Sequence, residues 1–561
     1  MLSVRKAFEE ELMPLNTDII ERVTSLSKKW PKRQMAMQKA YRLLRLTNDL
    51  QQPNMESVIS SDPRTGFNFA LWLMVPKTYR FLASPAGMSD RQLMDLGQVE
   101  SFVEGEFRTA IRNSRTSLRG SFLRQLVSLM LATGWYAVVS FPTQHGWVWR
   151  AWNPATVFPE YDEEGNLVEV GRIYSITGAQ ANQKVIGEGW LLPSRPWPNS
   201  TKVKVYNHWI MRGGRAWHSV VIGQHLAKEP TPTMMSRLPL YVGPCGGLPD
   251  DGSIMGDDSW TEDIGQSMLA PVLEVQKNYD KTLTYMQQLL RDASNPRFKF
   301  WSNGTSIDPD DWYKRGAFFE LNEGEDIRPV DAPPIPAELR AHLFDLRAQV
   351  QRSQFSDISF GAVQGRISAF LMSSVTATAR QILGPFEETL KAVLGDIATD
   401  NVATMRRIND QMGEKIFSLN GDPFPPLPDW VPFDFQYEIQ VPGDMIQRAN
   451  TARILNPSYR LPATTITGLL FPEIDNPLKE QANLMTEDAV NSNEFKSLSL
   501  IEELLRAAEE AQEVGDTQFS RRLERMAQRI ESQLLQTPQQ GMGPPGGNGS
   551  APNIQELMEG V

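Results

Sequence analysis

Cysteine is nearly absent from this chain of 561 residues, in which Cys245 is the single example. One cysteine excludes an internal disulfide and any zinc cluster built on cysteine ligands, and it suits a reducing compartment. Long apolar runs are also missing, since no segment approaches the ~20 apolar residues that a membrane-spanning helix needs. The N-terminus opens with charged residues and lacks the apolar core of an export signal, so we expect neither export nor a membrane partner.

Motifs for common enzyme chemistry are missing as well. The chain has no Gly-Lys pair, so it lacks the phosphate-binding loop of a nucleotide-driven motor. Its five histidines do not occur in HExxH spacing, and no GxSxG sequence is present. Cys245 could act as a nucleophile only beside a base, and a lone cysteine is more often buried and inert. We therefore predict a protein that is not an enzyme and carries no cofactor.

A cluster of acids at Asp308, Asp310 and Asp311 is the one pattern that suggests a metal. The glycine and the distal glutamate of a calcium-binding loop are missing at the required positions. Asp and Pro in this order are typical of a turn, so we interpret the cluster as a turn and predict no metal.

The acidic balance limits how the chain can treat nucleic acid. Its formal net charge is -11, and its isoelectric point is near 5.3. Such a charge excludes a protein that grips nucleic acid over its whole surface. At 63.3 kDa the chain is too long for one core, so we expect several domains of an α+β, mainly helical, fold.

Basic residues are concentrated near the N-terminus, where residues 18–50 have a helical pattern. The stretch carries no acid between its basic residues, which are Lys28, Lys29, Lys32, Arg33, Lys39, Arg42 and Arg45. Two interpretations stay open: a solvated helix face, which we favour, or a surface that docks an acidic partner.

Helical and β patterns then alternate in separate blocks. Two helical segments are predicted between Val99 and Thr133, and Gly134 follows at the position of a left-handed helix cap. Segments rich in β-branched and aromatic residues predict a mostly antiparallel β subdomain over Trp135–Phe141, Trp147–Trp152, Leu167–Ile176, Val203–Met211 and Ala216–Ile222. Residues 239–258 are rich in Pro, Gly and Asp and predict an irregular connection.

Two long helices with a small β module between them are predicted next. The first carries apolar residues at helical spacing from Ile264 to Leu290, and the second has a narrow stripe of Leu339, Leu343, Leu346 and Val350. Candidate strands at residues 297–301 and 317–321 lie between them. So small a module buries too little surface to be stable alone, so we expect copies of the chain to support it.

The remaining pattern is helical with two interruptions. Residues 355–372 are polar and contain glycine, and a helix then continues to about Met412 with Gly384-Pro385 inside it, where we predict a kink. After a Pro-rich link, Leu498–Leu535 predicts two helices broken at Gly515-Asp516. The end of the chain, from Thr537, is rich in Pro, Gly and Gln and predicts disorder.

This order of elements resembles the portal proteins of tailed bacteriophages over roughly residues 55–500. Five phrases look portal-like, and their order carries the resemblance: NPATVFPEYDEEGNLVEV from Asn153, GEDIRPV from Gly324, DISFG from Asp357, LGPFEETL from Leu383 and FPEIDNP from Phe471.

The resemblance implies a portal-type fold with wing, stem, clip and crown subdomains. The expected parts are a basic N-terminal helical segment (1–54), wing (55–258), first stem helix (259–294), clip (295–334), second stem helix (335–354), tunnel loop (355–372), kinked wing helix (373–412), wing return and linker (413–494), helical crown (495–536) and disordered tail (537–561).

A portal protein forms a ring, of twelve copies in this family, at one capsid vertex. The resemblance thus implies a virion protein, made in the host cytoplasm, that conducts double-stranded DNA during packaging and ejection. Implied partners are other copies of the chain, the large terminase subunit, a head-tail adaptor, and the major capsid and scaffolding proteins. An acidic subunit suits conduction, because tight phosphate pairing would hold the DNA in place.

Candidate site residues follow from these placements. For the DNA tunnel we select Arg347, Arg352 and Arg366, with Gly361 and Gly365 in the loop; the arginines could equally pair with acids of an adjacent copy. For terminase or adaptor contact the candidates in the clip are Arg297, Lys299, Asp308, Asp310, Asp311, Lys314 and Arg315.

Two alternatives stay open. Another head-tail connector, adaptor or capsid protein would lack the insertion between two long helices, which this sequence has. A carboxylate-based hydrolase would need acids that converge in a pocket, which one sequence cannot reveal.

Overall fold

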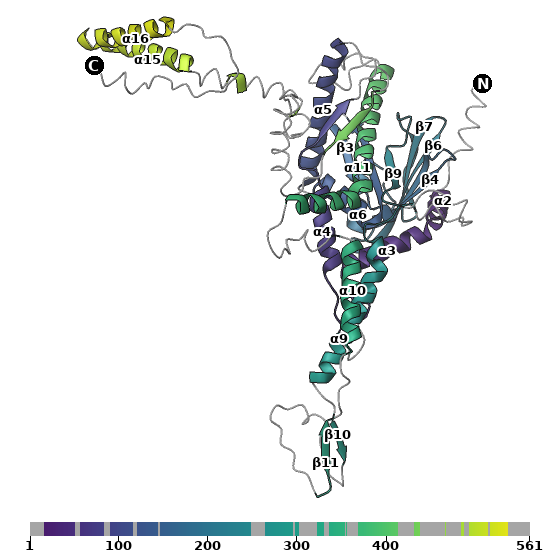
Figure 1. Cartoon of the computed structure of the whole chain (residues 1–561). Coiled ribbons are helices and arrows are strands. Elements are labelled where there is room, and N and C mark those ends of the chain that lie inside the picture. Colours follow the sequence, from purple (N-terminus) through teal and green to yellow (C-terminus); the bar gives the residue numbers. More distant parts are fainter. Residues whose placement is uncertain are drawn as a thin grey trace, which may run out of the picture. The chain divides into compact units, whose positions relative to one another are not determined.

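The structure is a computed structural model that describes residues 16–50, 57–83, 90–115, 120–143, 146–247, 264–294, 298–301, 323–329, 336–353, 355, 369–412, 431–437, 466, 484–486, 493–513 and 517–536. The chain forms two compact units, Met1–Gln447 and Arg448–Val561. The described residues mix helices with several small antiparallel sheets, so the fold class is α+β (Figure 1). None of the described helices is long and apolar enough to cross a membrane.

A five-stranded antiparallel sheet is the largest β element of the first unit. Its order is β4-β5-β6-β7-β8. The strands are β4 (Val157–Tyr161), β5 (Leu167–Thr177), β6 (Lys202–Arg212), β7 (Arg215–Ile222) and β8 (His225–Pro232). The predicted strands in β5, β6 and β7 are confirmed. Strand β8 escaped prediction because it contains prolines, which an edge strand tolerates since one side of it pairs with no other strand.

A second, three-stranded sheet has the order β3-β2-β9. Two of its strands precede the five-stranded sheet in the sequence, and one follows it. It consists of β2 (Trp135–Thr143), β3 (Gly146–Ala151) and β9 (Leu240–Pro244). The first two strands confirm the prediction. Residues 240–244 were expected in an irregular connection, and this was wrong: Leu240 and Val242 alternate into the core, so the segment pairs with β2.

Helices cover both sheets. They are α2 (Asn16–Lys28), α3 (Pro31–Leu44), α4 (Asp62–Met74), α5 (Asp90–Arg115), α6 (Phe122–Thr133) and α7 (Gly178–Gly187). The two predicted helices before Gly134 are confirmed as α5 and α6. Gly134 has φ +71° and donates its backbone N–H to Met130, so it is the predicted left-handed cap.

The N-terminal stretch is two helices rather than one, because Pro31 lacks a backbone donor and begins α3. Val23 of α2 is fully buried against β5, where Gly171 has no side chain to keep the helix away. Helices α2 and α3 are therefore integral to the β-containing body. The boundary expected at residue 54 does not separate two packing units within the described residues.

The helix pair consists of α9 (Leu273–Ser294) and α10 (Ala337–Ser353), which pack on each other. The first helix was expected from residue 259, and this was wrong for residues 264–272, because Pro271 lies in a short 3-10 turn, Ala270–Val272, that precedes α9. The second helix agrees with the expected 335–354 to within two residues. Helix α10 runs alongside α9 (Figure 1).

A β-hairpin connects these two helices. Strand β10 (Phe298–Trp301) pairs antiparallel with β11 (Asp326–Pro329). The predicted first strand is confirmed, whereas the expected partner at residues 317–321 lies outside the described residues. Only three residues separate Ser294 at the end of α9 from Phe298 at the start of β10, a span of roughly 14 Å at most, so the hairpin stays close to the C-terminal end of α9.

Helix α11 (Ala369–Met412) begins within the segment expected to be a loop and ends where predicted. Its second half is buried in the main core. Strand β12 (Phe433–Gln436) packs beside it and pairs with β1 (Arg80–Ala83), which joins segments far apart in the sequence. Gly395 permits this approach, since a side chain there would lie 2.3 Å from the Phe433 carbonyl oxygen.

The second unit contains a helical hairpin of α15 (Asn493–Glu513) and α16 (Thr517–Gln536). Ile501 and Ala508 of α15 pack toward Leu523 and Ala527 of α16, and these four side chains are buried. The predicted pair of helices broken near Gly515 is confirmed. The expected disordered tail at 537–561 lies outside the described residues.

Candidate functional site

The contact between α9 and α10 uses the apolar stripe predicted for α10. Leu346 and Val350 are buried, and Leu339 and Leu343 are half-buried. From α9, Tyr279 is buried, and Arg347 of α10 is close enough to act electrostatically on the Tyr279 hydroxyl. The stripe thus joins the two helices of one chain, and the remaining faces of the pair stay outside this contact.

A polar stripe on α9 holds the segment before α4. The Asp280 carboxylate accepts hydrogen bonds from the backbone N–H of Ser60 (3.0 Å) and from the Gln276 amide (2.9 Å). Thr284 accepts a bond from the Val58 N–H at 3.2 Å. Burial raises the pKa of Asp280 to about 6, although both hydrogen bonds oppose this rise. The signal that sequence reasoning missed is a row of polar residues four positions apart, Gln276, Asp280 and Thr284, beside the apolar repeat.

Large apolar side chains on the outer faces of the pair are exposed. Phe344 of α10 is 70% exposed, and Tyr285 and Leu290 of α9 are 48% and 42% exposed. These side chains contribute little to the packing of their own chain. These exposed side chains are candidates for a contact with another chain, where they would become buried.

Two of the tunnel candidates, Arg347 and Arg352, lie on α10, and both are exposed. They are five positions apart along α10, which places them about 140° apart around the helix. They therefore do not share a face and cannot both point toward one axis. Arg366, Gly361 and Gly365 lie outside the described residues.

The hairpin presents one polar, basic face. Lys299 of β10 lies directly opposite Arg328 of β11, and Trp301 lies opposite Asp326. Arg328 bonds Asp326 at 2.6 Å, and its guanidinium lies 5.8 Å from the Trp301 ring, which is 51% exposed. Because Asp326 balances the charge of Arg328, Lys299 leaves this face with a net charge of about +1.

Of the clip candidates, the structure describes Lys299 alone, and it is exposed in β10. The others lie outside the described residues: Arg297, Asp308, Asp310, Asp311, Lys314 and Arg315. Sequence reasoning missed Arg328 and Trp301. Arg328 is in the phrase GEDIRPV, and Trp301 is in the predicted strand at residues 297–301. Only the pairing register of β10 and β11 shows that the two side chains share a face.

Gly384 and Pro385 lie inside α11, and the helix continues through both. Figure 1 shows α11 changing direction within its length. Proline removes one backbone hydrogen bond and crowds the preceding turn, which accounts for a bend in a helix of this length. That the bend centres on Gly384-Pro385 stays a prediction.

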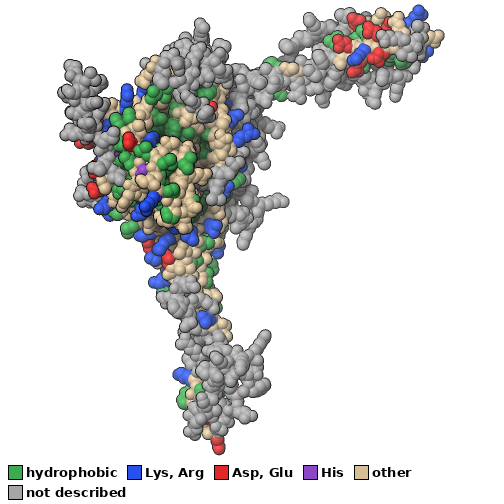
Figure 2. Space-filling view, turned by 180° about the vertical axis from the view of Figure 1, so that it is seen from behind, with side chains coloured by type: hydrophobic (Ala, Val, Ile, Leu, Met, Phe, Trp, Pro, Cys, Tyr) green, Lys and Arg blue, Asp and Glu red, His purple; other side chains and the backbone are tan. Residues whose placement is uncertain are grey.

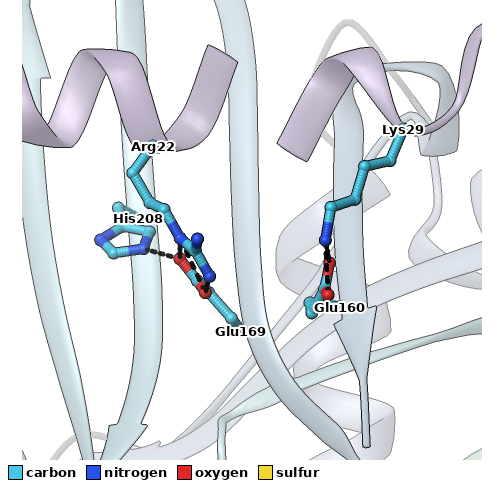
Figure 3. A network of polar contacts seen from close by, with 5 residues as sticks. All are labelled: Arg22, Lys29, Glu160, Glu169 and His208. Carbon is cyan, nitrogen blue, oxygen red and sulfur yellow. Dashed lines mark hydrogen bonds and ion pairs between the residues drawn. The ribbon is translucent and has the colours of Figure 1, made fainter. Parts of the chain in front are cut away.

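A buried ion-pair network fastens α2 to the sheet (Figure 3). Arg22 donates two short bonds to Glu169, from Nη2 to Oε2 at 2.6 Å and from Nε to Oε1 at 2.9 Å. His208 Nε2 lies 2.7 Å from Oε1 of the same carboxylate. Burial alone would raise the pKa of Glu169, but the bonds from His208 and Arg22 outweigh it and lower the pKa to about 2.

Among the basic N-terminal residues, two groups differ in their surroundings. Lys29 pairs with Glu160 at 2.6 Å, and Arg33 is buried with its guanidinium against both the Trp30 and Trp135 rings, so these two serve the chain's own packing. The second group, Lys39, Arg42 and Arg45, is exposed on α3 and beyond its end. Figure 2 shows Lys and Arg side chains gathered where the β-containing body meets the helix pair.

Cys245 and two aspartates of α11 are buried or half-buried groups with shifted pKa values. Cys245 is buried with its thiol 3.8 Å from the Met130 carbonyl, and burial raises its pKa, so it stays protonated. On α11, burial raises the pKa of Asp396 and of Asp400, and Asp400 is bonded by Tyr241 and Arg237. No group of metal-binding side chains occurs among the described residues.

Comparison with known proteins adds no relative. No protein-family model matches the chain, and a search of curated proteins finds no significant match. The function is therefore inferred from the residues, the order of the elements and the exposed surfaces described above.

Proposed function

We propose that the chain is the subunit of a portal ring of a tailed bacteriophage, with the wing, stem, clip and crown parts that the resemblance implies. In this role α9 and α10 are the stem, β10 and β11 belong to the clip, and α15 and α16 belong to the crown. The ring stands at one capsid vertex and conducts double-stranded DNA. Its partners are other copies, the large terminase subunit, an adaptor, and capsid and scaffolding proteins.

The observation that best supports the proposal is the exposed apolar surface of the helix pair. Phe344 and Tyr285 are both large and about half exposed or more. They lie outside the apolar stripes through which α9 and α10 pack on each other. In a monomer this surface would face water at a cost of about 25 cal/mol per Å². Copies arranged side by side would bury it.

The heights of these side chains suit such a ring. Arg347 lies near Tyr279, so the antiparallel arrangement places Phe344 at about the height of Thr282 and about 4.5 Å along the axis from Tyr285. Rotation about an axis parallel to the helices preserves height. Phe344 of one copy can therefore approach Tyr285 of the next copy across an offset of about 4.5 Å, which is less than one helical turn.

The same contact assigns different surroundings to the two arginines. On a helical wheel, Arg347 lies about 60° to one side of Phe344 and Arg352 about 80° to the other side. If Phe344 faces the next copy, one arginine faces the channel and the other faces outward. One basic position per copy centres DNA without clamping it, which agrees with the acidic net charge of -11.

The test is assembly of the purified full-length chain, followed by mass photometry and negative-stain microscopy. We expect annular particles with a central hole for the wild type. Phe344→Asp should abolish the rings, because it places a charge at the contact, whereas Phe344→Leu should keep them. Far-ultraviolet circular dichroism checks that both variants remain folded.

A wild-type chain that stays monomeric at high concentration would contradict the proposal. Rings that survive Phe344→Asp would leave assembly standing but would exclude the Phe344 contact. Turnover in a screen with nucleotides, nucleic acids and sugars would favour the hydrolase alternative.

A further inference from the structure

A second cluster of functional groups lies on the five-stranded sheet, on the face opposite α2. Arg172, Asn207, Val220 and Lys228 are directly paired across β5, β6, β7 and β8, so their side chains point to one face. Helix α7 packs toward the same face through Val185, and it contributes Lys184. We call Arg172, Lys184, Asn207, His218 and Lys228 the donor cluster.

The three cations of the donor cluster are half-buried, and two of them, Arg172 and Lys184, lie against aromatic rings. The Arg172 guanidinium lies 4.0 Å from the Trp152 ring and 4.3 Å from the Tyr174 ring. The Lys184 ammonium lies 5.4 Å from the same Tyr174 ring and 5.3 Å from the Trp190 ring. It also donates a hydrogen bond to the Tyr174 hydroxyl at 2.7 Å. Ring contacts fix the direction of side chains that would otherwise rotate freely in water.

The hydrogen bonds of His218 determine its tautomer. Its Nε2 lies 3.0 Å from Asn207 Oδ1, which can only accept, so Nε2 carries the proton. Its Nδ1 then accepts a bond from Lys228 Nζ at 2.9 Å. Burial and the nearby Lys228 and Lys184 charges keep the pKa of His218 well below its ordinary value, so the imidazole is neutral. The Asn207 amide nitrogen donates to no described residue.

The two lysines of the donor cluster have no acid at ion-pair distance among the described residues. Glu188 acts on Lys228 only from farther away. Burial lowers the pKa of Lys228, which reflects the cost of a poorly solvated cation. Two lysines and an amide donor gather around His218, with no described carboxylate at ion-pair distance from either lysine, and this is the chemistry of an anion site.

We propose that the donor cluster binds a phosphate-type oxyanion, with Lys184, Lys228 and Asn207 as donors and Arg172 stacked beside them. Tetrahedral oxyanions accept several hydrogen bonds at once, which matches donors that approach from a sheet and from a helix. The site is independent of ring formation, since every member comes from one chain.

The experiment is calorimetric titration of the full-length chain with inorganic phosphate, against chloride at the same ionic strength. We expect saturable binding that weakens about tenfold or more in Lys228→Gln and in Lys184→Gln, since each removes a charge-assisted hydrogen bond. Lys204→Gln is the matched control, because it removes one exposed charge from β6 away from the cluster. It should change the affinity less than about twofold.

A short DNA duplex forms the second arm. Saturation by phosphate but not by the duplex indicates a small anion, whereas duplex binding that depends on Lys228 indicates backbone phosphate; both support the site. Absence of saturable phosphate and duplex binding, or equal losses in Lys204→Gln and Lys228→Gln, overturns it. The cations would then serve packing alone. If Lys228→Gln fails to fold, Lys184→Gln decides.

Discussion

Glu169 offers the sharpest test of how the N-terminal helix is held. Its carboxylate is only 3% exposed and lies between Arg22 and His208. The fall of its pKa from an ordinary 4.5 to about 2 corresponds to at most about 3 kcal/mol of stability. Arg22 is half exposed, so solvent screening reduces this figure, and we expect Glu169→Gln to lower the free energy of unfolding by about 2 kcal/mol at pH 7.

The pH dependence of this loss has a defined sign. The folded chain holds the Glu169 proton less tightly than the unfolded chain, so the contribution is present above about pH 4.5 and is lost as the pH falls toward 2. Urea unfolding, followed by tryptophan fluorescence, should therefore show the gap between wild type and Glu169→Gln closing as the pH is lowered over this range.

Glu160→Gln is the matched control, because Glu160 pairs with Lys29 at the surface and both are solvent-accessible. It should cost less than about 1 kcal/mol. A Glu169→Gln variant as stable as the control at pH 7, or a gap that does not change with pH, would refute the reasoning. Such a result would mean that Arg22 and His208 do not stabilise the carboxylate.

Two further predictions concern the interior. Asp280→Asn should raise stability by roughly 1 kcal/mol at pH 7.5, because the folded chain binds the Asp280 proton more tightly than the unfolded chain. Wild-type stability then declines as the pH rises from 3.8 through about 6, and equal melting temperatures of variant and wild type at pH 7.5 would contradict this. Gly134→Ala should cost more than about 2 kcal/mol in urea unfolding, because its φ is positive and the new carbon would lie 2.2 Å from the Gln266 backbone. Gly120→Ala has a similar φ but no atom within 4 Å, so it should cost about 1 kcal/mol, and equal losses would exclude the clash.

The elements with strong periodic patterns were predictable. The stripe from Leu339 to Val350 predicted α10, and the glycine after Thr133 predicted a left-handed cap. Elements whose residues contradict local preference were not. Strand β8 contains two prolines, and β9 lies in a segment rich in Pro and Gly, so each forms only because a neighbouring strand is available to pair with it.

The candidate residues were predicted less completely than the elements. Sequence spacing placed Arg347 and Arg352 on one helix. The exposure of Phe344, which lies between them on the helical wheel, was needed to assign a direction to each arginine. The donor cluster escaped entirely, because Arg172 and Lys228 are 56 positions apart and meet through the register of four strands. No local signal marks residues that long-range pairing brings together.

The amino-acid sequence by itself determined the α+β class, the order of most elements, the acidic charge and the absence of common enzyme motifs. These properties depend on composition and on patterns within one segment, so they need no knowledge of neighbours. Only the tertiary structure decided that α2 and α3 belong to the β-containing body, that Glu169 is buried between Arg22 and His208, and that Phe344 remains exposed. Burial and pairing depend on contacts between distant segments, and those contacts exist only after the chain has folded.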